Sequence, residues 1–340
     1  MTKHKVRSPR SPEPPRTASI VGTGSYTPSR VLTNADLEKI VDTSDEWIVT
    51  RTGIRERRIA APNEATSDMA TKAGAAALEQ AGIKAEEVDL LIVATVSPDM
   101  WFPSTACFVQ RKLGAKNATC FDISAACAGF LYGLETAQQF ITSRTKNTAL
   151  VIGADKLSAL VDWTDRNTCV LFGDGAGAAV LRNRGDVHGL LVTTMGSDGT
   201  QTDILQIPVG GSAAPLTSAN INDRMNTIKM SGREVFKHAV NAMVRAAFEA
   251  LEHCGLTPDD IACVIPHQAN MRIIEAVGER IKVPIDRFYV NLDKYGNTSA
   301  AAVAIALDEA NRTGRIRKGD YVLLVVFGGG LTWASSVIQW

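Results

Sequence analysis

The residue best placed to act as a nucleophile is Cys127, which lies among small side chains between Asp122 and Gly129. The residues before it, from Ala118 on, are typical of a strand, and those from Gly129 to Thr142 are typical of a helix. Cys127 is therefore predicted at or near a helix N terminus, where unpaired backbone N–H groups and the positive end of the helix dipole favour a thiolate. The alternative for this segment alone is a buried cysteine that packs as a small hydrophobic residue.

Three further features could complete a reaction centre with this cysteine: His267, Asn297 and the glycines at 328–330. Each has a simpler interpretation: His267 as a hydrogen-bonded residue at a strand end, Asn297 as a turn or N-cap residue, and the glycines as an ordinary turn. Together they suit acyl transfer. A cysteine forms a thioester and so divides one difficult step into two. Side chains that donate hydrogen bonds can hold an enolate oxygen, and backbone N–H groups of a glycine turn can hold a tetrahedral oxyanion.

Alternating helix-like and strand-like segments must position these residues. A strand-like pattern begins at Ala18, an N-capped helix begins near Ser44, and the spacing of apolar residues predicts a helix over Thr66–Ala81 that ends at Gly82. Continuous apolar runs, typical of strands buried on both faces, lie at Val88–Thr95, Ala149–Gly153, Ile261–His267 and Val322–Val326.

The second half of the chain repeats the first. Residues 77–88 align with residues 250–261 at an offset of 173, and the same offset aligns the strand at 149 with the strand at 322. A similar offset of 170 places the Cys127 turn on the Asn297 turn. Two such α/β halves can share one compact body. We expect the carboxyl ends of the strands that lead to Cys127, His267 and Asn297 to meet near the pseudo-two-fold axis, where α/β proteins bind ligands.

Composition limits the class of protein. The 340 residues are 45% hydrophobic and 21% charged, with a formal net charge of zero, so overall charge gives no case for nucleic acid or membrane binding. No apolar run is long enough to span a membrane. The six cysteines have no metal-binding spacing and no secretory signal precedes them, which predicts reduced thiols, a cytoplasmic location and no metal site. Residues 1–17 are predicted to be a disordered, basic and proline-rich tail.

In this order and spacing, the motifs resemble the β-ketoacyl-acyl-carrier-protein synthases III, condensing enzymes of the thiolase superfamily. The resemblance runs from about Ala18 to Trp340. The matching segments are Ser44–Arg57, Ala125–Phe130, Phe172–Ala178, Pro266–Asn270, Tyr295–Ala300 and Phe327–Trp333. The resemblance implies a thiolase-like αβαβα fold of five layers built from two similar halves, residues 18–187 and 188–340, and a homodimer.

The resemblance also implies roles for individual residues. Cys127 would take the acyl group, His267 and Asn297 would serve decarboxylation and condensation, and the N–H groups of Cys127 and Gly329 would form the oxyanion hole. The residues implied to bind coenzyme A are Trp47, Arg51, Arg166 and Asn270. Those implied to form the acyl pocket are Phe102, from the partner subunit, together with Leu157, Phe172, Phe236 and Phe327. A basic patch for the carrier protein would comprise Lys237, Arg272, Arg280 and Lys282, although solvated helix faces explain such charges equally simply.

The expected reaction is the decarboxylative condensation of a short acyl-coenzyme A starter with malonyl-acyl carrier protein, which starts fatty acid synthesis. Coenzyme A enters as a thioester substrate, and no cofactor is expected because departing CO₂ generates the carbanion. One alternative is a related condensing enzyme of secondary metabolism, of the polyketide type, with another starter or acceptor. An alternative of a different class is a protein that binds coenzyme A or carrier protein without catalysis, against which the intact Cys127, His267 and Asn297 argue. The bulky pocket residues favour a short starter.

Overall fold

The computed structural model describes residues 16–185 and 188–340, and the first sheet is built from residues that precede 186. Its strand order is β1-β7-β6-β4-β5. The strands are β1 (Ala18–Tyr26), β4 (Leu90–Ala94), β5 (Thr119–Ile123), β6 (Thr148–Lys156) and β7 (Asp174–Asn183). One face packs against α3 (Thr66–Ala81) and α4 (Thr105–Leu113), and the other against α5 (Gly129–Thr142) and α10 (Ala301–Arg312). Because helices cover both faces, β4 is buried along its whole length.

The second sheet comes from residues after 188 and has the order β11-β12-β13-β8. Its strands are β8 (Gly189–Ser197), β11 (Ile261–Pro266), β12 (Tyr321–Gly328) and β13 (Thr332–Gln339). The long helix α7 (Gly232–Cys254) packs against β8, β12 and β13, and α8 (Met271–Ile281) packs against α7. β11 pairs in parallel with β12, as β4 pairs with β6 in the first sheet.

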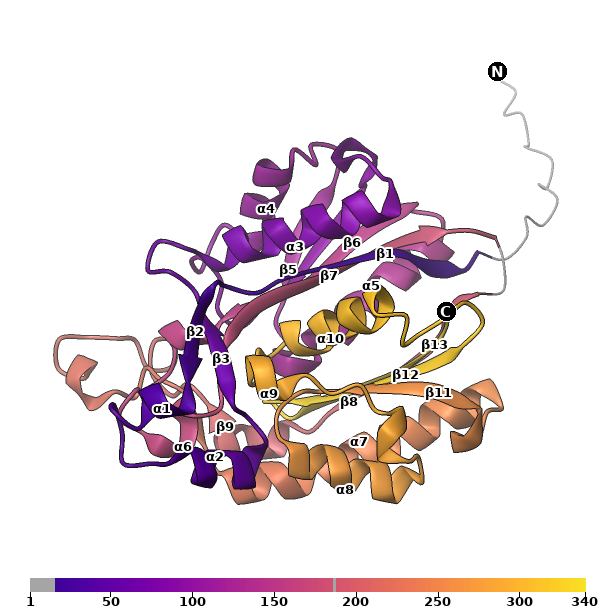
Figure 1. Ribbon diagram of the computed structural model, residues 1–340. Coiled ribbons are helices and arrows are strands. Elements are labelled where there is room, and N and C mark those ends of the chain that lie inside the picture. Colours follow the sequence, from indigo (N-terminus) through magenta and orange to yellow (C-terminus); the bar gives the residue numbers. More distant parts are fainter. Residues whose placement is uncertain (1–15, 186–187) are drawn as a thin grey trace.

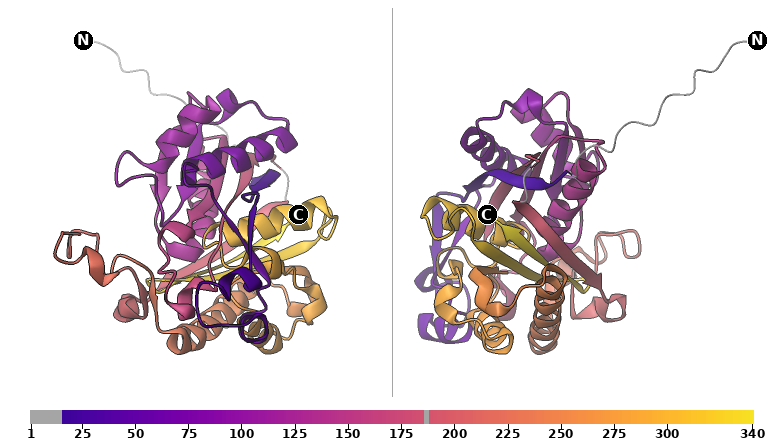
Figure 2. Two further views of the ribbon diagram at one scale, coloured as in Figure 1. Left: turned by 60° about the vertical axis from the view of Figure 1, so that its left-hand side comes forward. Right: turned by 90° about the vertical axis from the view of Figure 1, so that its right-hand side faces the viewer.

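Five layers result, with α5 and α10 between the two sheets and the other long helices outside (Figure 1). The two further views show the same stacking and a segment between residues 207 and 228 that projects from the body (Figure 2). Three apolar clusters fill the interior: one beneath each outer helix layer and one around the middle helix layer, in contact with both sheets. The predicted five-layered αβαβα fold is therefore confirmed. Among residues 16–185 and 188–340, no helix is long and apolar enough to cross a membrane.

The interior helix α10 lies unusually close to the first sheet. Nine of its twelve residues are buried, and most of these are alanine. A side chain built at Gly153 in β6 would come within 2.3 Å of the Ala300 carbonyl oxygen, and one at Gly177 in β7 within 2.5 Å of the Ala304 Cβ. Small residues on both sides therefore set the distance between helix and sheet.

The smaller elements surround the site. β2 (Arg30–Thr33) pairs with β3 (Glu56–Ile59), and β9 (Leu205–Gln206) with β10 (Lys229–Met230). The short helices are α1 (Asn34–Leu37), α2 (Asp45–Thr52), α6 (Arg166–Cys169) and α9 (Leu292–Tyr295).

A fully buried arginine, Arg57 in β3, ties this region together. Its guanidinium donates to the carbonyl oxygens of Leu32, at 3.2 Å, and Val170, at 2.7 Å, and to Asn34 Oδ1 at 2.8 Å. Burial lowers its pKa to about 10, so it remains charged at neutral pH. The β2–β3 pair is thereby fixed to the segment that leads into Phe172.

Most predicted elements are confirmed, including the helices Thr66–Ala81 and Gly129–Thr142. The prediction that a strand leads to Asn297 is wrong. The counterpart of β5 in the second half is reduced to one bridge between Val264 and Phe288, and Asn297 follows the short α9 and forms a bridge with Phe172. Gly296 takes φ 63°, which strand residues do not adopt. The predicted tail, 1–17, lies almost wholly outside the described residues.

Candidate active site

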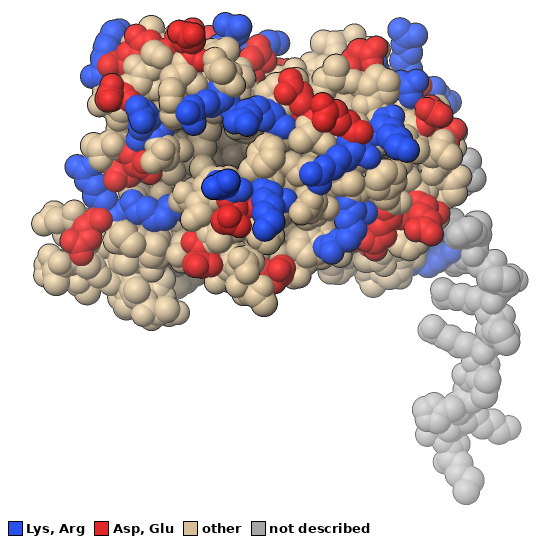
Figure 3. Space-filling view, turned by 90° about the horizontal axis from the view of Figure 1, so that it is seen from below, with Lys and Arg blue, Asp and Glu red and all other residues tan. Residues whose placement is uncertain are grey.

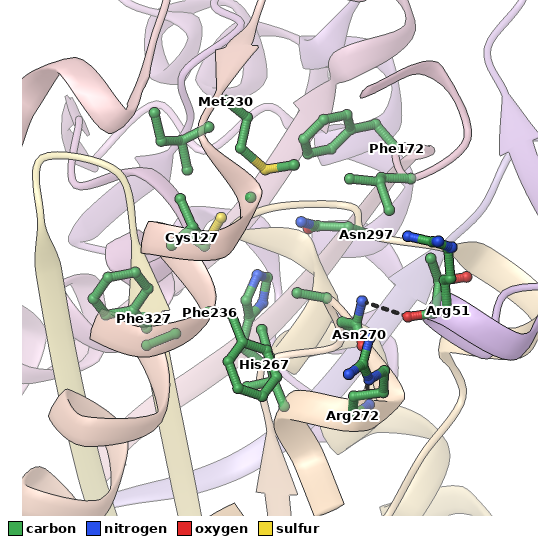
Figure 4. Close-up of a pocket in the computed structure, with 18 of the residues that line it drawn as sticks. Arg51, Cys127, Phe172, Met230, Phe236, His267, Asn270, Arg272, Asn297 and Phe327 are labelled. Atoms are coloured by element: carbon green, nitrogen blue, oxygen red, sulfur yellow. Dashed lines mark hydrogen bonds between the residues drawn. The ribbon is translucent and has the colours of Figure 1, made fainter. Parts of the chain in front are cut away.

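A cavity of about 580 Å³ brings together Cys127, His267 and Asn297, which lie far apart in the sequence. Their side chains point into the same space (Figure 4). Cys127 comes from the turn after β5, His267 from the end of β11, and Asn297 from the loop before α10. The predicted meeting of these three turns is confirmed, although only two of them follow strands. Apolar side chains around the centre include Phe172, Met230, Phe236, Ile273 and Phe327.

Cys127 lies in a single helical turn, Ala126–Ala128, immediately before α5, so its predicted place at a helix start is confirmed. Its side chain is buried, with 9% exposure. Burial raises the pKa of the Cys127 thiol to about 12, although a hydrogen bond from Ser299 opposes this shift. The expectation of a thiolate at rest is therefore wrong: loss of hydration outweighs the favourable helix terminus.

His267 is held by its backbone, whose N–H donates to the Val325 carbonyl oxygen on β12 at 2.8 Å. Its Nδ1 is buried and has no hydrogen-bond partner among the described residues. Burial lowers the pKa of the imidazole to about 4, so the ring is neutral at physiological pH. A neutral imidazole carries one N–H and can donate one hydrogen bond to a developing oxyanion.

Asn297 is fixed at three points, which orient its amide. Its N–H donates to the Leu171 carbonyl oxygen at 2.8 Å, and its carbonyl oxygen accepts from the Gly173 N–H at 3.0 Å. Its side-chain Oδ1 accepts from the Ser299 N–H at 2.8 Å. Since Oδ1 is engaged, the amide NH₂ is the group that remains to donate into the cavity.

The glycine turn between β12 and β13 lies against the nucleophile. A side chain at Gly328 would come within 2.7 Å of the Cys127 backbone nitrogen, so only glycine permits this approach. Gly328 lines the cavity, whereas Gly329 is not among its described lining residues and lies beside the Leu205 carbonyl oxygen. The role implied for the Gly329 N–H stays a prediction, and Gly328 of the same triple glycine lies against the Cys127 backbone.

Three of the four residues expected to bind coenzyme A line the cavity mouth: Trp47, Arg51 and Asn270. Asn270 Nδ2 donates to the Arg51 carbonyl oxygen at 3.0 Å. The guanidinium groups of Arg51 and Arg166 each lie 4.8 Å from the Trp47 ring centroid. A base held between Trp47 and Arg166 needs about 7 Å between the two planes, twice a van der Waals contact. Arg166 must therefore move before an adenine can enter.

The predicted acyl-pocket residues divide into two groups. Phe172, Phe236 and Phe327 line the cavity. Leu157 is 2% exposed and is not among the described residues that line the cavity. Phe102 is 84% exposed, in the loop before α4, and does not reach the described cavity of its own chain.

The four residues predicted to dock a carrier protein are all exposed on or beside α7 and α8: Lys237, Arg272, Arg280 and Lys282. Arg272 also lines the cavity, and Arg280 donates to Asn241 Oδ1 at 2.7 Å. This face of the molecule is hollowed, and Lys and Arg side chains stand around the hollow (Figure 3).

Comparison with known proteins agrees with this arrangement. The models for 3-oxoacyl-[acyl-carrier-protein] synthase III and for the C-terminal part of that enzyme match residues 121–199 and 251–340. A β-ketoacyl-[acyl-carrier-protein] synthase III from Caldanaerobacter subterraneus subsp. tengcongensis is 60% identical over 323 residues, which cover 95% of this chain and 98% of that protein.

Two solved structures are also similar. 3-oxoacyl-[acyl-carrier-protein] synthase III from Aquifex aeolicus has a TM-score of 0.89 at 50% identity and covers 95% of this chain and 100% of its own. The priming β-ketosynthase of a polyketide pathway has a TM-score of 0.89 at 38% identity, covering 97% of this chain and 98% of its own. The chain therefore belongs to the β-ketoacyl-[acyl-carrier-protein] synthase III family.

Proposed function

We propose that this chain is an acyltransferase that condenses a short acyl starter from coenzyme A with malonyl-acyl carrier protein and so starts fatty acid synthesis. The observation that carries the proposal is the cavity that unites Cys127, His267 and Asn297. A cysteine that can hold an acyl group and two side chains that donate hydrogen bonds are what the two half-reactions need.

In the first half-reaction, Cys127 attacks the thioester carbon and coenzyme A leaves. We expect the backbone N–H groups of Cys127 and Gly329 to stabilise the tetrahedral oxyanion, and the close packing of the neighbouring Gly328 against the Cys127 nitrogen supports this role for the glycine turn. Trp47 and Arg51 hold the nucleotide end of coenzyme A at the mouth, with Arg166 after it swings away from the indole. Asn270 holds the arm that reaches Cys127.

In the second half-reaction, malonyl-carrier protein loses CO₂ and its thioester oxygen gains negative charge. Neutral His267 and the free NH₂ of Asn297 donate hydrogen bonds to this oxygen. The resulting enolate carbon attacks the acyl group on Cys127 and releases the β-ketoacyl product. The reaction needs no metal or redox cofactor, since the departing CO₂ leaves the carbanion behind.

The partners follow from the surface. The exposed cations beside the cavity mouth suit an acidic carrier protein, with Arg272 nearest to the entrance. We expect a homodimer, because Trp101 and Phe102 are 81% and 84% exposed in one loop and such aromatic surface favours a second subunit. We place the reaction in the cytoplasm, where the six cysteines, all free in the structure, would remain reduced.

A second candidate function is the priming step of a polyketide pathway, which the structural likeness to a priming β-ketosynthase supports. Phe172, Phe236 and Phe327 line the cavity in which a starter would lie. A panel of acyl-coenzyme A starters assayed with malonyl-carrier protein distinguishes the two functions by the preferred starter.

The test separates the half-reactions by mutation. The wild-type enzyme incubated with acetyl-coenzyme A should gain one acetyl group on Cys127, detected by mass spectrometry, and should release CO₂ from malonyl-carrier protein. His267→Ala and Asn297→Ala should still accept acetyl but lose about 10²–10³ in the rate of CO₂ release.

Cys127→Ala should lose acyl transfer and retain some CO₂ release, because both donors remain. An absent acyl adduct on the wild type would support a protein that only binds coenzyme A. Loss of acylation in His267→Ala, with decarboxylation intact, would instead make His267 the base for the cysteine.

A further inference from the structure

The single helical turn α9 leads directly to Asn297. Asn291 precedes the turn as its N-cap residue, and the Gly296 N–H closes it by donating to the Leu292 carbonyl oxygen at 2.9 Å. Because the turn is closed by its own hydrogen bond, its two ends move together. The bonds of Asn297 to the first half of the chain fix one side of its backbone, so whatever holds α9 fixes the other side.

The start of α9 is held by Gln268, the residue after His267. Gln268 is 1% exposed, and its amide makes three hydrogen bonds. Nε2 donates to the carbonyl oxygens of Pro266, at 2.8 Å, and Tyr289, at 3.1 Å, while Oε1 accepts from the Asn291 N–H at 3.0 Å. Both N–H groups of the amide meet acceptors and its oxygen meets a donor, so the amide has one orientation only.

A carboxylate on α10 holds both ends of α9. Glu309 Oε2 accepts from Asn291 Nδ2 at 3.0 Å, and its Oε1 accepts from the Tyr295 hydroxyl at 2.6 Å. The Tyr289 hydroxyl adds a bond to Oε2 at 3.2 Å. Burial raises the pKa of Tyr289 to about 12 and raises that of Tyr295 as well, so both hydroxyls keep the protons that they donate.

These bonds join the two segments that carry the hydrogen-bond donors of the site. The Pro266 carbonyl group immediately precedes His267, and Asn291 begins the turn that leads to Asn297. The side chains of His267 and Asn297 point into the same space (Figure 4). The amide of Gln268 therefore sets how far apart the backbones of the two donors lie.

We propose that Gln268 and Glu309 are positioning residues that set the separation of the two donors and so control decarboxylation rather than acyl transfer. This inference rests on the proposed function, in which His267 and Asn297 donate to one thioester oxygen. Two donors that must meet one oxygen tolerate little displacement, because a misplacement of about 1 Å can cost about 10²-fold in rate.

Acyl transfer should not depend on this network. Cys127 lies in the turn after β5, and the glycine turn lies between β12 and β13. The hydrogen bonds of the Gln268 amide and the Glu309 carboxylate named above reach neither turn. The two half-reactions therefore respond differently when the network is broken.

The first test is Gln268→Met, which keeps the length of the side chain and removes all three hydrogen bonds. CO₂ release from malonyl-carrier protein should fall about tenfold, since a displaced donor costs less than the 10²–10³ typical of a deleted one. Single-turnover acetylation of Cys127 by acetyl-coenzyme A, followed by mass spectrometry, should stay within a few-fold of the wild type. The matched control is Gln138→Met on α5, which removes an amide that donates to the Leu190 carbonyl oxygen at 3.0 Å and should change neither rate.

A milder variant keeps the test decisive if Gln268→Met fails to fold. Tyr295→Phe removes one hydroxyl from Glu309 and should slow CO₂ release by about three- to tenfold, with acetylation unchanged. In an Asn297→Ala background the same change should cost nothing further, because the hydroxyl acts only through the asparagine amide. The control is Tyr132→Phe, whose hydroxyl donates to the Gly196 carbonyl oxygen at 2.9 Å.

The ratio of the two rates separates positioning from general destabilisation, which would lower both by the same factor. Equal losses in the two half-reactions, unchanged CO₂ release in both Gln268→Met and Tyr295→Phe, or a full additional loss from Tyr295→Phe in the Asn297→Ala background would overturn the positioning role. A wild type that takes no acetyl group from acetyl-coenzyme A would instead refute the proposed function itself.

Discussion

The neutral state of His267 has a measurable effect on stability. Burial holds the pKa of His267 at about 4 in the folded chain, against an ordinary value of 6.5. Between about pH 4 and pH 6.5, His267 therefore binds a proton in the unfolded chain but not in the folded chain. The free energy of unfolding should fall as the pH drops from about 6.5 towards about 4, and this contribution should change no further below that pH.

The size of the effect follows from the two pKa values. The full difference of about 2.5 pH units, between 6.5 and about 4, corresponds to about 3 kcal/mol. At about pH 5, where the folded-state histidine is still mostly neutral, about 2 kcal/mol of this should already be lost. Other buried acids, such as Asp155 and Asp174, also have a raised pKa, and they oppose this trend because they favour the protonated folded form at low pH.

A matched variant isolates the histidine. His267→Gln has a similar size and does not titrate, so the contributions of the buried acids are common to both proteins. Urea unfolding at about pH 7.5 and about pH 5 should show the wild type losing about 2 kcal/mol more than His267→Gln. Equal losses in the two proteins would refute the argument, because His267 would then titrate in the folded state as it does in the unfolded chain.

Three further predictions follow from the site and its frame. Trp47→Ala should raise KM for acyl-coenzyme A by about 10–100-fold with little change in kcat, because one base stack is lost. Arg166→Ala should raise KM less, since this arginine must first leave the indole. Equal KM values in the wild type and Trp47→Ala would contradict the stacking role. Light scattering should show a dimer, and Phe102→Ala should alter starter preference without changing the fold, whereas a stable monomer would exclude a shared pocket. Arg57→Met should lower the free energy of unfolding, measured in urea, by about 2–4 kcal/mol, because three buried acceptors lose their donor. Arg58→Met removes a partly exposed ion pair with a carboxylate and should lower the same free energy by less than about 1 kcal/mol.

The sequence predicted the regular elements well because their signals are local. The helix over Thr66–Ala81 ends at Gly82 in the left-handed conformation that its glycine suggested, and the apolar runs around Leu90 and Val322 are strands covered on both faces. The repeat predicted that the turns of Cys127 and Asn297 would meet, since corresponding turns of two related halves must lie near one axis.

Three features of the site escaped prediction because they depend on contacts between distant segments. The resting state of Cys127 is decided by burial among groups from both halves, which outweighs the local helix terminus. The hydrogen bond from the Ala300 N–H to Asp155 Oδ2 joins residues 145 positions apart, and no sequence pattern reveals it. Leu157 was expected in the pocket, but it is buried and does not line the described cavity.

The close approach of α10 to the first sheet restricts which substitutions the chain can accept. No residue of the helix is among those that line the described cavity, yet the turn of Cys127 follows a strand on one side of it and His267 follows a strand on the other. A longer side chain at Ala304, which faces Gly177, would push the two sheets apart and separate the cysteine from the histidine. Natural variation at Ala304 should therefore be confined to small residues, and random mutagenesis should find inactive yet folded variants there, outside the residues that line the cavity.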